Sequence, residues 1–491
     1  MKTEPYTGLK YVHTTAKLFD GFKATHCCLV VSFQRLLFFL SLTYIFSLSA
    51  CSTKTTQASL PIDTPESFSS TGDLIPADEW WTSFKDPRLN TLVEQAIDSN
   101  MNLTAVWYRF REAQAIVDRQ SSFLLPDVEA SLRSSLNRPQ PDFVGGENVQ
   151  LGLSAFYEVD LWGRISALVK AERFRTEASF ADYRAASISL SAEITSTWYQ
   201  LMAEWQQLEL IEEQINTNQK ILDFIKAQFG SGQIRSVDIL RQQQLVEATR
   251  EQRIQTESRI EVLEHQLAVL LGRPAQNEIA YAPDSLPELP PLPDTGIPAA
   301  LLQRRPDVQS AFHLLQASDR EVAAAISNRY PRLSISTSAQ LRANNFDNLL
   351  EDWAYSLGGN LVAPLFYGGR LNAEVDRTQA VKNQRLYEYG QTVLVAFQEV
   401  EDALIQERKQ LESIEVLEEQ VELATSASQQ LEIEYFNGLS DYLAVLTALN
   451  QEQQLRRDLI TANSLLLEYR IALYRALAGG FETARELETE S

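Results

Sequence analysis

Residues that build metal sites, disulfides and redox centres are scarce in this 491-residue chain, which contains three cysteines and three methionines. Its four histidines are scattered: His13, His26, His265 and His313. No HExxH or CxxC motif occurs, and no glycine-rich phosphate loop lies between a predicted strand and a predicted helix. The pair Glu264-His265 on a helix is more typical of a solvated face than of a metal site. The sequence therefore predicts no enzyme, no cofactor and no metal centre.

Positive charge is scarce too. The chain has 43 Lys and Arg residues against 65 Asp and Glu residues, a net charge of −22. Residues 1–50 contain five basic and two acidic side chains, so the remainder has 38 basic and 63 acidic ones, a net charge of −25. Such an acidic balance disfavours nucleic acid and anionic lipid surfaces as partners. Most of these charges are expected only to keep helices soluble.

Glycine and proline are absent from two long segments, 165–229 and 233–271, which meet at Gly230–Gly232. Each segment can stay helical at about 1.5 Å per residue, so the first would be roughly 95 Å long. Globular helices average only about 11–12 residues. The glycines can end the first helix in left-handed conformation, and Ser236 or Asp238 is suited to cap the second. The sequence predicts a long helical hairpin with its tip at these glycines.

This hairpin occurs twice in the chain. Gly163 and Gly232 return as Gly369 and Gly438, each 206 residues later. Such a spacing indicates a two-fold internal duplication. We expect a first repeat over 80–273, a second over 307–480 and a tail over 481–491. The proline-rich connection 274–306 between the repeats is expected to contain no helix.

Within each repeat, shorter helices and strands are expected before the hairpin. One helical stretch runs from Trp80 to about Leu125, and its counterpart runs over 307–328. The second long hairpin covers 370–436, interrupted only by Gly390, and then 440–478. Glycines at 479 and 480 close its return helix.

Four segments of about 10 residues alternate between apolar and small or polar side chains, the pattern of half-buried strands. They are 128–137, 149–160, 333–342 and 353–365. Their length and pattern match outer-membrane barrel strands. Four strands cannot close a barrel, and an open edge is not tolerated in lipid, so chains must associate; three copies would supply 12 strands. A soluble four-stranded sheet, covered by the helices that leave each hairpin, is the alternative.

The sequence predicts a secretion signal at the N-terminus. Leu36–Ala50 is an apolar run that follows Arg35 and has the length of a signal-peptide core. Its end, Leu48-Ser49-Ala50-Cys51, resembles a bacterial lipobox, which implies that Cys51 is lipidated after removal of residues 1–50. An ordinary signal peptide or an N-terminal membrane helix is the alternative. Residues 51–79 are expected to form a lipidated tether.

Several motifs together resemble one known family. The segment Gly296–Val308 (GIPAALLQRRPDV) is similar to the inter-repeat signature of outer-membrane efflux lipoproteins of the TolC superfamily, NodT/OprM branch. Trp80-Trp81, Glu158–Arg164 (EVDLWGR) and Ala363–Arg370 (APLFYGGR) also fit this family. The resemblance covers essentially all of the chain from Cys51 to Phe481.

The resemblance implies a mainly α protein with a membrane β-barrel. It implies a homotrimer in which a 12-stranded β-barrel in the outer membrane of a Gram-negative bacterium joins a 12-helix α-barrel in the periplasm. The duct would passively receive drugs or small toxic compounds from an inner-membrane pump, usually of the resistance-nodulation-division type, through a periplasmic adaptor. Export of peptides, proteins or metal ions is the alternative within transport. A periplasmic coiled-coil scaffold is the non-transport alternative.

The resemblance also assigns two kinds of site. The hairpin tips would contact the adaptor through six residues: Gly232, Gln233, Ile234, Gly438, Leu439 and Ser440. The helices after the tips would close the pore, and the candidates for its constriction are Asp238, Asp441, Leu443 and Thr447. Thr447 stands where many relatives carry Asp, so that carboxylate cannot be transferred to this chain. Helix capping is the alternative role of Asp238 and Asp441.

Overall fold

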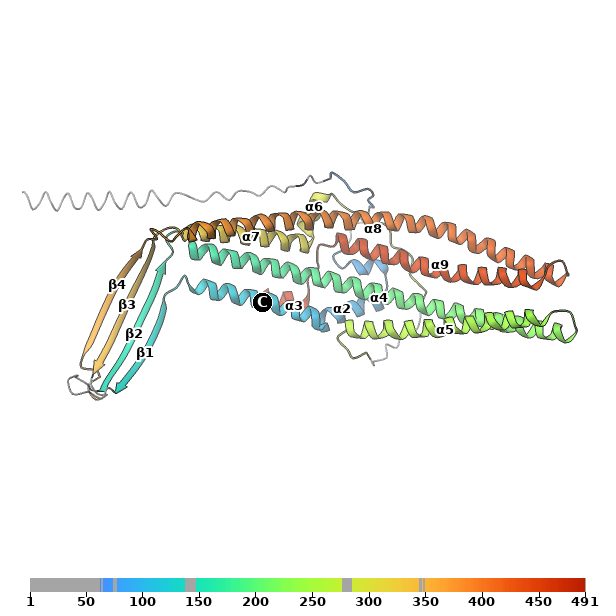
Figure 1. Ribbon diagram of the computed structural model, residues 1–491, viewed down its shortest axis with the longest axis horizontal. Helices are drawn as coiled ribbons and strands as arrows, with labels where there is room; N and C mark the ends of the chain where they lie inside the picture. The colour runs from blue at the N-terminus through green and yellow to red at the C-terminus, as the bar shows by residue number, and fades with distance from the viewer. Residues whose placement is uncertain are drawn as a thin grey trace, which may run out of the picture. The chain divides into compact units, whose positions relative to one another are not determined.

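One four-stranded sheet and two pairs of very long helices dominate the described part of the chain (Figure 1). The computed structural model describes residues 62, 65–73, 77–136, 147–275, 285–343, 347 and 349–490. The predicted signal peptide 1–50 and the lipidation site Cys51 lie outside these residues and stay predictions.

The first repeat contains more breaks than the sequence indicated. Its elements are η1 (Trp80–Phe84), α2 (Pro87–Ser99), α3 (Met101–Ser122), β1 (Asp127–Leu136), β2 (Glu147–Val159), α4 (Arg164–Gly230) and α5 (Ser236–Leu270). The expectation of one helical stretch from Trp80 to Leu125 is wrong, because the backbone is extended at Asn100. The side chain of Asn100 accepts a 2.9 Å hydrogen bond from the Leu103 amide and donates a 2.9 Å bond to the Leu270 carbonyl. Asn100 therefore caps α3 and anchors this corner to the end of α5.

The second repeat follows the same order. Its elements are α7 (Pro306–Ser327), β3 (Arg332–Ala343), β4 (Trp353–Val362), α8 (Arg370–Phe436) and α9 (Tyr442–Leu477). The short helix α6 (Pro298–Arg304) precedes them, and α10 (Ala484–Glu490) follows in the tail. The connection between the repeats contains the short helix α6, against expectation. Pro298 is its first residue, where a missing N–H costs no helical hydrogen bond.

Both ends of the described chain pack onto the repeats. In the expected tether, Phe68 is buried against Phe397 of α8, and the Ser69 amide donates to Glu401 at 2.8 Å. In the C-terminal tail, the Thr483 hydroxyl lies 2.8 Å from that of Tyr183 on α4. These segments therefore fasten the second repeat to the first.

The duplication is confirmed in the lengths of the elements. Helices α4 and α8 contain 67 residues each, about 100 Å, and α3 and α7 contain 22 each. Both long helices start after a left-handed glycine, Gly163 with φ 72° and Gly369 with φ 83°. Helix α8 runs through Gly390 without a break.

The sheet is antiparallel, with the order β1-β2-β3-β4, so β1 and β4 are its edges. Its register aligns the apolar positions of all four strands: Leu132 pairs with Leu151, Leu151 with Leu341, and Leu341 with Trp353. One face is therefore apolar across the whole sheet. The opposite face carries small and polar residues, among them Ser131, Gly152, Ser154, Ser336, Ser338, Ser356 and Gly358.

The apolar face of the sheet stays open. The helices leave the sheet at one end instead of crossing its face (Figure 1). Trp353 is 75% exposed, and Leu132, Leu153 and Leu357 are exposed as well. The alternative of a soluble sheet covered by its own helices does not describe this structure.

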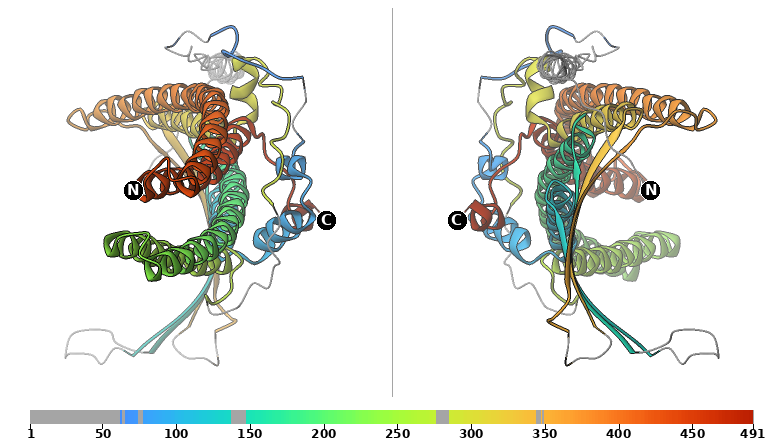
Figure 2. Two further views of the ribbon diagram at one scale, coloured as in Figure 1. Left: turned by 90° about the vertical axis from the view of Figure 1, so that its right-hand side faces the viewer. Right: turned by 90° about the vertical axis from the view of Figure 1, so that its left-hand side faces the viewer.

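The helices form a curved layer with two free sides (Figure 2). Near the sheet, neighbouring helices follow the order α3-α4-α7-α8. Toward the hairpin tips the order is α5-α4-α9-α8. The outer members are therefore α3 and α5 on one side and α8 on the other.

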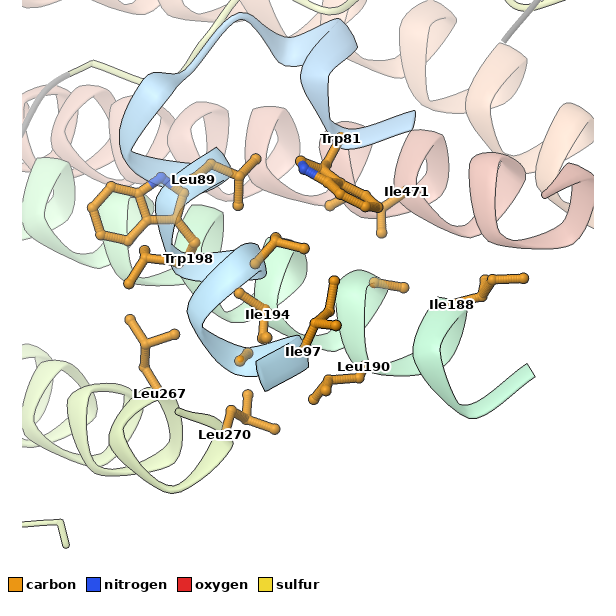
Figure 3. Close-up of a cluster of buried hydrophobic side chains, with 14 of the residues drawn as sticks. Trp81, Leu89, Ile97, Ile188, Leu190, Ile194, Trp198, Leu267, Leu270 and Ile471 are labelled. Carbon is orange, nitrogen blue, oxygen red and sulfur yellow. The ribbon is translucent and has the colours of Figure 1, made fainter. Parts of the chain in front are cut away.

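The main core lies where the short N-terminal elements cover the long helices (Figure 3). Trp81 and Leu89 from η1 and α2 pack in one cluster with Ile194 of α4, Leu267 of α5 and Ile471 of α9. Because apolar burial contributes about 25 cal/mol per Å², this cluster is a major source of stability. It holds the two hairpins together at their base.

Candidate functional site

Both hairpin tips are tight turns on left-handed glycines. Gly232 has φ 77° and Gly438 has φ 72°, and no atom lies close to the position a Cβ would take at either. The Leu439 amide closes the second tip by donating to the Glu434 carbonyl at 2.8 Å. Of the six tip residues, four are exposed and two, Ile234 and Ser440, are half-buried. The tips are thus accessible to a partner, although adaptor contact itself stays a prediction.

Asp238 does not occupy the position that the sequence suggested. Neither Ser236 nor Asp238 caps α5, because the N-cap is Arg235 and no side chain satisfies the free amides there. The Asp238 side chain is only 5% exposed and lies 3.2 Å from Arg235 and 3.7 Å from Arg241. In this conformation its carboxylate is enclosed by two cations.

The other three constriction candidates lie together on the first turns of α9 and are exposed. Asp441 caps the helix by accepting a 2.9 Å hydrogen bond from the Ala444 amide. Leu443 and Thr447 are one turn apart, and the Thr447 hydroxyl donates to the Leu443 carbonyl at 2.8 Å. The capping role of Asp441 is confirmed, and a role in the pore stays a prediction.

Two tyrosines beside the tips were not predicted from the sequence. The Tyr442 hydroxyl donates a 2.6 Å hydrogen bond to Gln242 of α5, and the Tyr435 hydroxyl donates a 2.7 Å bond to Gln228 of α4. Burial, together with the nearby Tyr435 and Asp238, raises the pKa of Tyr442 well above its usual range. Tyr442 therefore stays a neutral donor. Both bonds join the first hairpin to the second.

A buried polar seam continues from these tyrosines along the contact between the hairpins. The Gln242 amide donates to the Asn218 carbonyl at 2.8 Å. Asn218 also exchanges side-chain hydrogen bonds with Gln453 of α9, at 2.9 and 3.2 Å. Farther from the tips, Gln207 donates to the Arg457 carbonyl at 2.6 Å. Buried polar groups must find such partners, so this seam fixes the register of α4 against α9. Polar residues at positions where a helical period demands apolar ones were the available sequence signal.

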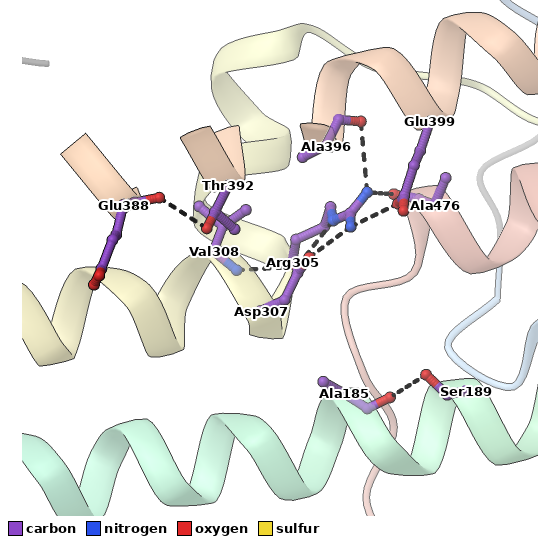
Figure 4. Close-up of polar contacts among 10 residues, drawn as sticks. All are labelled: Ala185, Ser189, Arg305, Asp307, Val308, Glu388, Thr392, Ala396, Glu399 and Ala476. Atoms are coloured by element: carbon purple, nitrogen blue, oxygen red, sulfur yellow. Dashed lines mark hydrogen bonds and ion pairs between the residues drawn. The ribbon is translucent and has the colours of Figure 1, made fainter. Parts of the chain in front are cut away.

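Arg305 of the inter-repeat motif has a structural role (Figure 4). It is buried and donates to Asp307 at 2.6 and 2.9 Å and to Glu399 at 2.8 Å. Burial opposes the charge, but these two carboxylates outweigh burial and raise the pKa of Arg305. Its guanidinium also reaches the carbonyls of Ala396 and Ala476. Arg305 thus fixes the start of α7 against α8 and α9, beside a cavity of about 250 Å³.

The polar face of the sheet carries short side chains near its middle, beside longer ones such as Gln150 and Gln340. Ser338 and Ser356 face each other across β3 and β4 with hydroxyl oxygens 2.8 Å apart. Within the described ranges, no three His, Cys, Asp or Glu side chains come together as a metal site would require. Among the described helices, none is both long and apolar enough to span a bilayer.

A two-faced sheet joined end-on to duplicated helical hairpins is the fold of outer-membrane channels in which a β-barrel continues as a helical barrel. The chain belongs to the outer membrane efflux protein family, which it matches over residues 92–273 and 297–479. This family lies in the TolC superfamily that the motifs indicated.

Its relatives are outer-membrane parts of export systems. The pyoverdine export outer membrane protein OpmQ of Pseudomonas aeruginosa is 29% identical over 430 residues, which cover 83% of this chain and 88% of OpmQ. The toluene efflux pump outer membrane protein TtgF of Pseudomonas putida is 25% identical over 413 residues, which cover 82% of this chain and 85% of TtgF. The chain is thus an outer-membrane efflux channel of a Gram-negative bacterium.

Solved structures agree with this fold. The outer-membrane channel OprN has 28% sequence identity and a TM-score of 0.78, over 86% of this chain and 95% of OprN. The channel CusC, at 23% identity, has a TM-score of 0.80 over 88% of this chain and 100% of CusC.

Proposed function

We propose that three copies of this chain form one exit duct that carries drugs or other small toxic compounds passively to the exterior. The compounds would come from an inner-membrane pump of the resistance-nodulation-division type, through a periplasmic adaptor that binds the hairpin tips. The observation that carries this proposal is the arrangement of the free edges of the chain.

These edges form two continuous sides. The edge elements β1, α3 and α5 all belong to the first repeat, whereas β4 and α8 belong to the second. A head-to-tail contact between copies would therefore place β4 beside β1, and α8 beside α3 and α5, all at once. Because β1 and β4 run in opposite directions, the new strand pair would be antiparallel like the others. Repeated contacts of this kind close into a ring when the rotation between neighbouring copies divides a full turn evenly.

The free sides of the helices carry matching apolar stripes. On α5 the exposed stripe consists of Leu240, Ile254 and Val269. On α8 it consists of Leu394, Ile405, Val416 and Leu423. Within each stripe the spacings are close to whole numbers of helical turns, so each stripe lies along one face. A neighbouring copy would remove both stripes from water.

Three copies fit the side chains of the sheet best. Two copies would give eight strands, and a barrel of about eight strands has an interior that side chains fill. Here the middle of the polar face carries many small side chains, such as Gly152, Ser154, Ser338, Ser356 and Gly358, which leave space along the axis. Twelve strands would enclose a water-filled lumen with the apolar face toward lipid.

The substrate class rests on the relatives. OpmQ is named for pyoverdine export and TtgF for toluene efflux, both small molecules. Peptide, protein or metal-ion export is the second candidate. A methionine-based metal relay has little to build on, because only Met101 and Met202 lie beyond residue 51. No catalytic step is proposed.

Two adjacent residues of β1 test the barrel. Leu132 lies on the apolar face and Ser131 on the polar face. Leu132→Arg should reduce heat-modifiable trimers in the outer membrane, because an arginine on the lipid face costs about 2–4 kcal/mol near the bilayer midplane. Ser131→Arg places the same charge in the lumen and should leave trimers intact. Equal tolerance of both changes, or the absence of heat-modifiable trimers in the unchanged protein, would favour a periplasmic scaffold.

Efflux itself is tested in cells. A strain that lacks the chain should accumulate a small fluorescent drug, and expression of the chain should restore its export. If export of a peptide or a metal ion responds instead, the second candidate is correct.

A further inference from the structure

One contact inside the chain joins the two repeats where the helices meet the sheet. Trp162, between β2 and α4, packs against Tyr330, between α7 and β3, with the two rings tilted and their centroids 5.0 Å apart. Its indole N–H donates a 2.7 Å hydrogen bond to the Pro331 carbonyl. The Ser327 hydroxyl donates a 2.9 Å bond to the Trp162 carbonyl. The junction leaving the first strand hairpin is therefore fastened to the junction entering the second.

The duplication gives each of the two junctions a counterpart elsewhere in the chain, but these two counterparts do not contact each other within the described part of the chain. Ser122, Leu125 and Pro126 precede Ser327, Tyr330 and Pro331 by 205 residues. The segment Leu365–Gly368, between β4 and α8, stands 206 residues after the one that contains Trp162. Both parts are exposed within the chain: Leu125 of the first repeat is 67% exposed, and Phe366 of this segment is 87% exposed. Each half of a second contact is thus present on an opposite edge of the chain.

A cavity lies beside the junction between α3 and β1, which has no partner from the second repeat among the described residues of this chain. A hollow of about 330 Å³ lies between the end of α3, strands β1 and β2 and the start of α4. Its lining is apolar at Phe123, Leu125, Phe156 and Ile165 and polar at Gln120, Asp127 and the ion pair of Glu158 with Arg164. An engineered protein cavity of about 150 Å³ already holds a benzene molecule. The hollow is therefore large enough for an aromatic side chain.

We infer that the Leu365–Tyr367 segment of one copy seats in this hollow of the next copy, with Phe366 as the inserted ring. The occupant is a second copy because the same junctions already meet within the chain, and because β4 and α8 continue into β1 and α3 in the proposed ring. The Ser122 hydroxyl would donate to the Gly368 carbonyl, as Ser327 does to Trp162. Gly368 stands where the first repeat has Trp162 and has no side chain to bind the neighbouring junction. The adjacent apolar residues Leu365 and Phe366 would make this contact instead. This inference rests on the ring of the proposed function.

Cross-linking in native outer membranes tests it. The double variant Leu125→Cys/Phe366→Cys, treated with a short bismaleimide and then heated in detergent, should give covalent dimers and trimers. Each single variant should give none. The pair Tyr330→Cys/Phe366→Cys is the matched control and should also give none, because Tyr330 already lies against Trp162 of its own chain.

A second variant measures what the contact contributes. Phe366→Ala should lower the temperature at which trimers dissociate on gels, whereas Phe224→Ala near the tips should lower it less. The inference is wrong if trimers form, no cross-link joins positions 125 and 366, and Phe366→Ala leaves the dissociation temperature unchanged. Lipid would then cover Phe366, and the proposed ring would still stand. The absence of trimers in the unchanged protein would overturn the proposed ring as well.

Discussion

The Tyr442 hydroxyl lies 2.6 Å from the amide oxygen of Gln242 and ties the first turn of α9 to α5, directly behind the two hairpin tips. Both side chains are buried, and the Gln242 amide group donates a hydrogen bond to the Asn218 carbonyl of α4. One phenol thus connects the second hairpin to both helices of the first.

Tyr442→Phe should loosen this connection. The change removes the hydroxyl donor and leaves the buried amide oxygen of Gln242 without this hydrogen bond. The free energy of unfolding should fall by about 1–3 kcal/mol per copy. If the hairpins must separate for the duct to open, the variant should have a higher resting conductance in planar bilayers. Tyr387→Phe, at an exposed position of α8, is the control and should conduct like the unchanged protein. Equal conductance of both variants would place the closure elsewhere.

The sequence predicted the regular parts of the fold well. The long helices, their offset of 206 residues and the four alternating strands follow from local period and from the absence of glycine and proline, which are properties of each segment. The break at Asn100 was missed although asparagine is a common N-cap, and its side chain caps α3 at the Leu103 amide. Only its second bond, to Leu270, 170 residues away, has no local signature. The capping role assigned to Asp238 was wrong because Arg235 and Arg241 enclose its carboxylate.

The sites were predicted less completely for the same reason. The tip glycines have a local signature, since a tight turn needs left-handed dihedrals. The pair of Tyr442 and Gln242 has none, because 200 residues separate its members and only the packing of α9 against α5 brings them together.

A substitution at Asp441 can distinguish a role in helix capping from a role in ion selection. Its side chain caps α9 and is exposed beside Leu443 and Thr447. If three copies face the pore axis, Asp441→Asn should reduce cation selectivity in planar bilayers, because a ring of carboxylates attracts cations. The helix should persist, since Asn caps as well as Asp. Unchanged selectivity and conductance would leave closure to apolar neighbours such as Leu439 and Leu443.

The tips can be tested by steric change. Gly232 and Gly438 have positive φ angles in open space, so a bulky residue there adds backbone strain and a side chain at the docking surface. Gly438→Leu should abolish efflux while trimers still form. Gly438→Asn is the control and should keep efflux, because asparagine tolerates the left-handed conformation and adds only a small side chain. Loss of trimers in Gly438→Leu would instead indicate a structural role for the tip.

Lipidation of Cys51 is tested by mass. Mass spectrometry of the outer-membrane protein should find Cys51 as the first residue, carrying acyl chains. Cys51→Ser should block this processing, while some transport survives because the barrel still holds the chain in the membrane. An unchanged N-terminus in Cys51→Ser would make the segment an ordinary signal peptide or a membrane helix.

Asp160 should make the junction of sheet and helix sensitive to acid. Its carboxylate accepts hydrogen bonds from the Ile165 amide at 3.0 Å, and from the Ser166 amide and hydroxyl at 2.8 and 2.6 Å. Burial opposes the charge, but these bonds and the nearby Arg164 outweigh burial and lower the pKa of Asp160 below its usual 3.8.

A lowered pKa in the folded state means that the carboxylate stabilises the protein above pH 3.8 and that this contribution is lost as the pH falls through the lower folded-state value. Asp160→Asn should therefore lower the stability of detergent-solubilised trimers by about 1 kcal/mol at neutral pH, because the bonds to a charged acceptor weaken. The difference between the two proteins should shrink as the pH is taken below 3.8. Ser166→Ala removes one of the bonds and should shift the acid loss toward higher pH. The stability difference between Asp160→Asn and the unchanged protein could instead stay constant well below pH 3.8. Such a result would show that the shape of the Asp160 side chain, and not its charge, stabilises the start of α4.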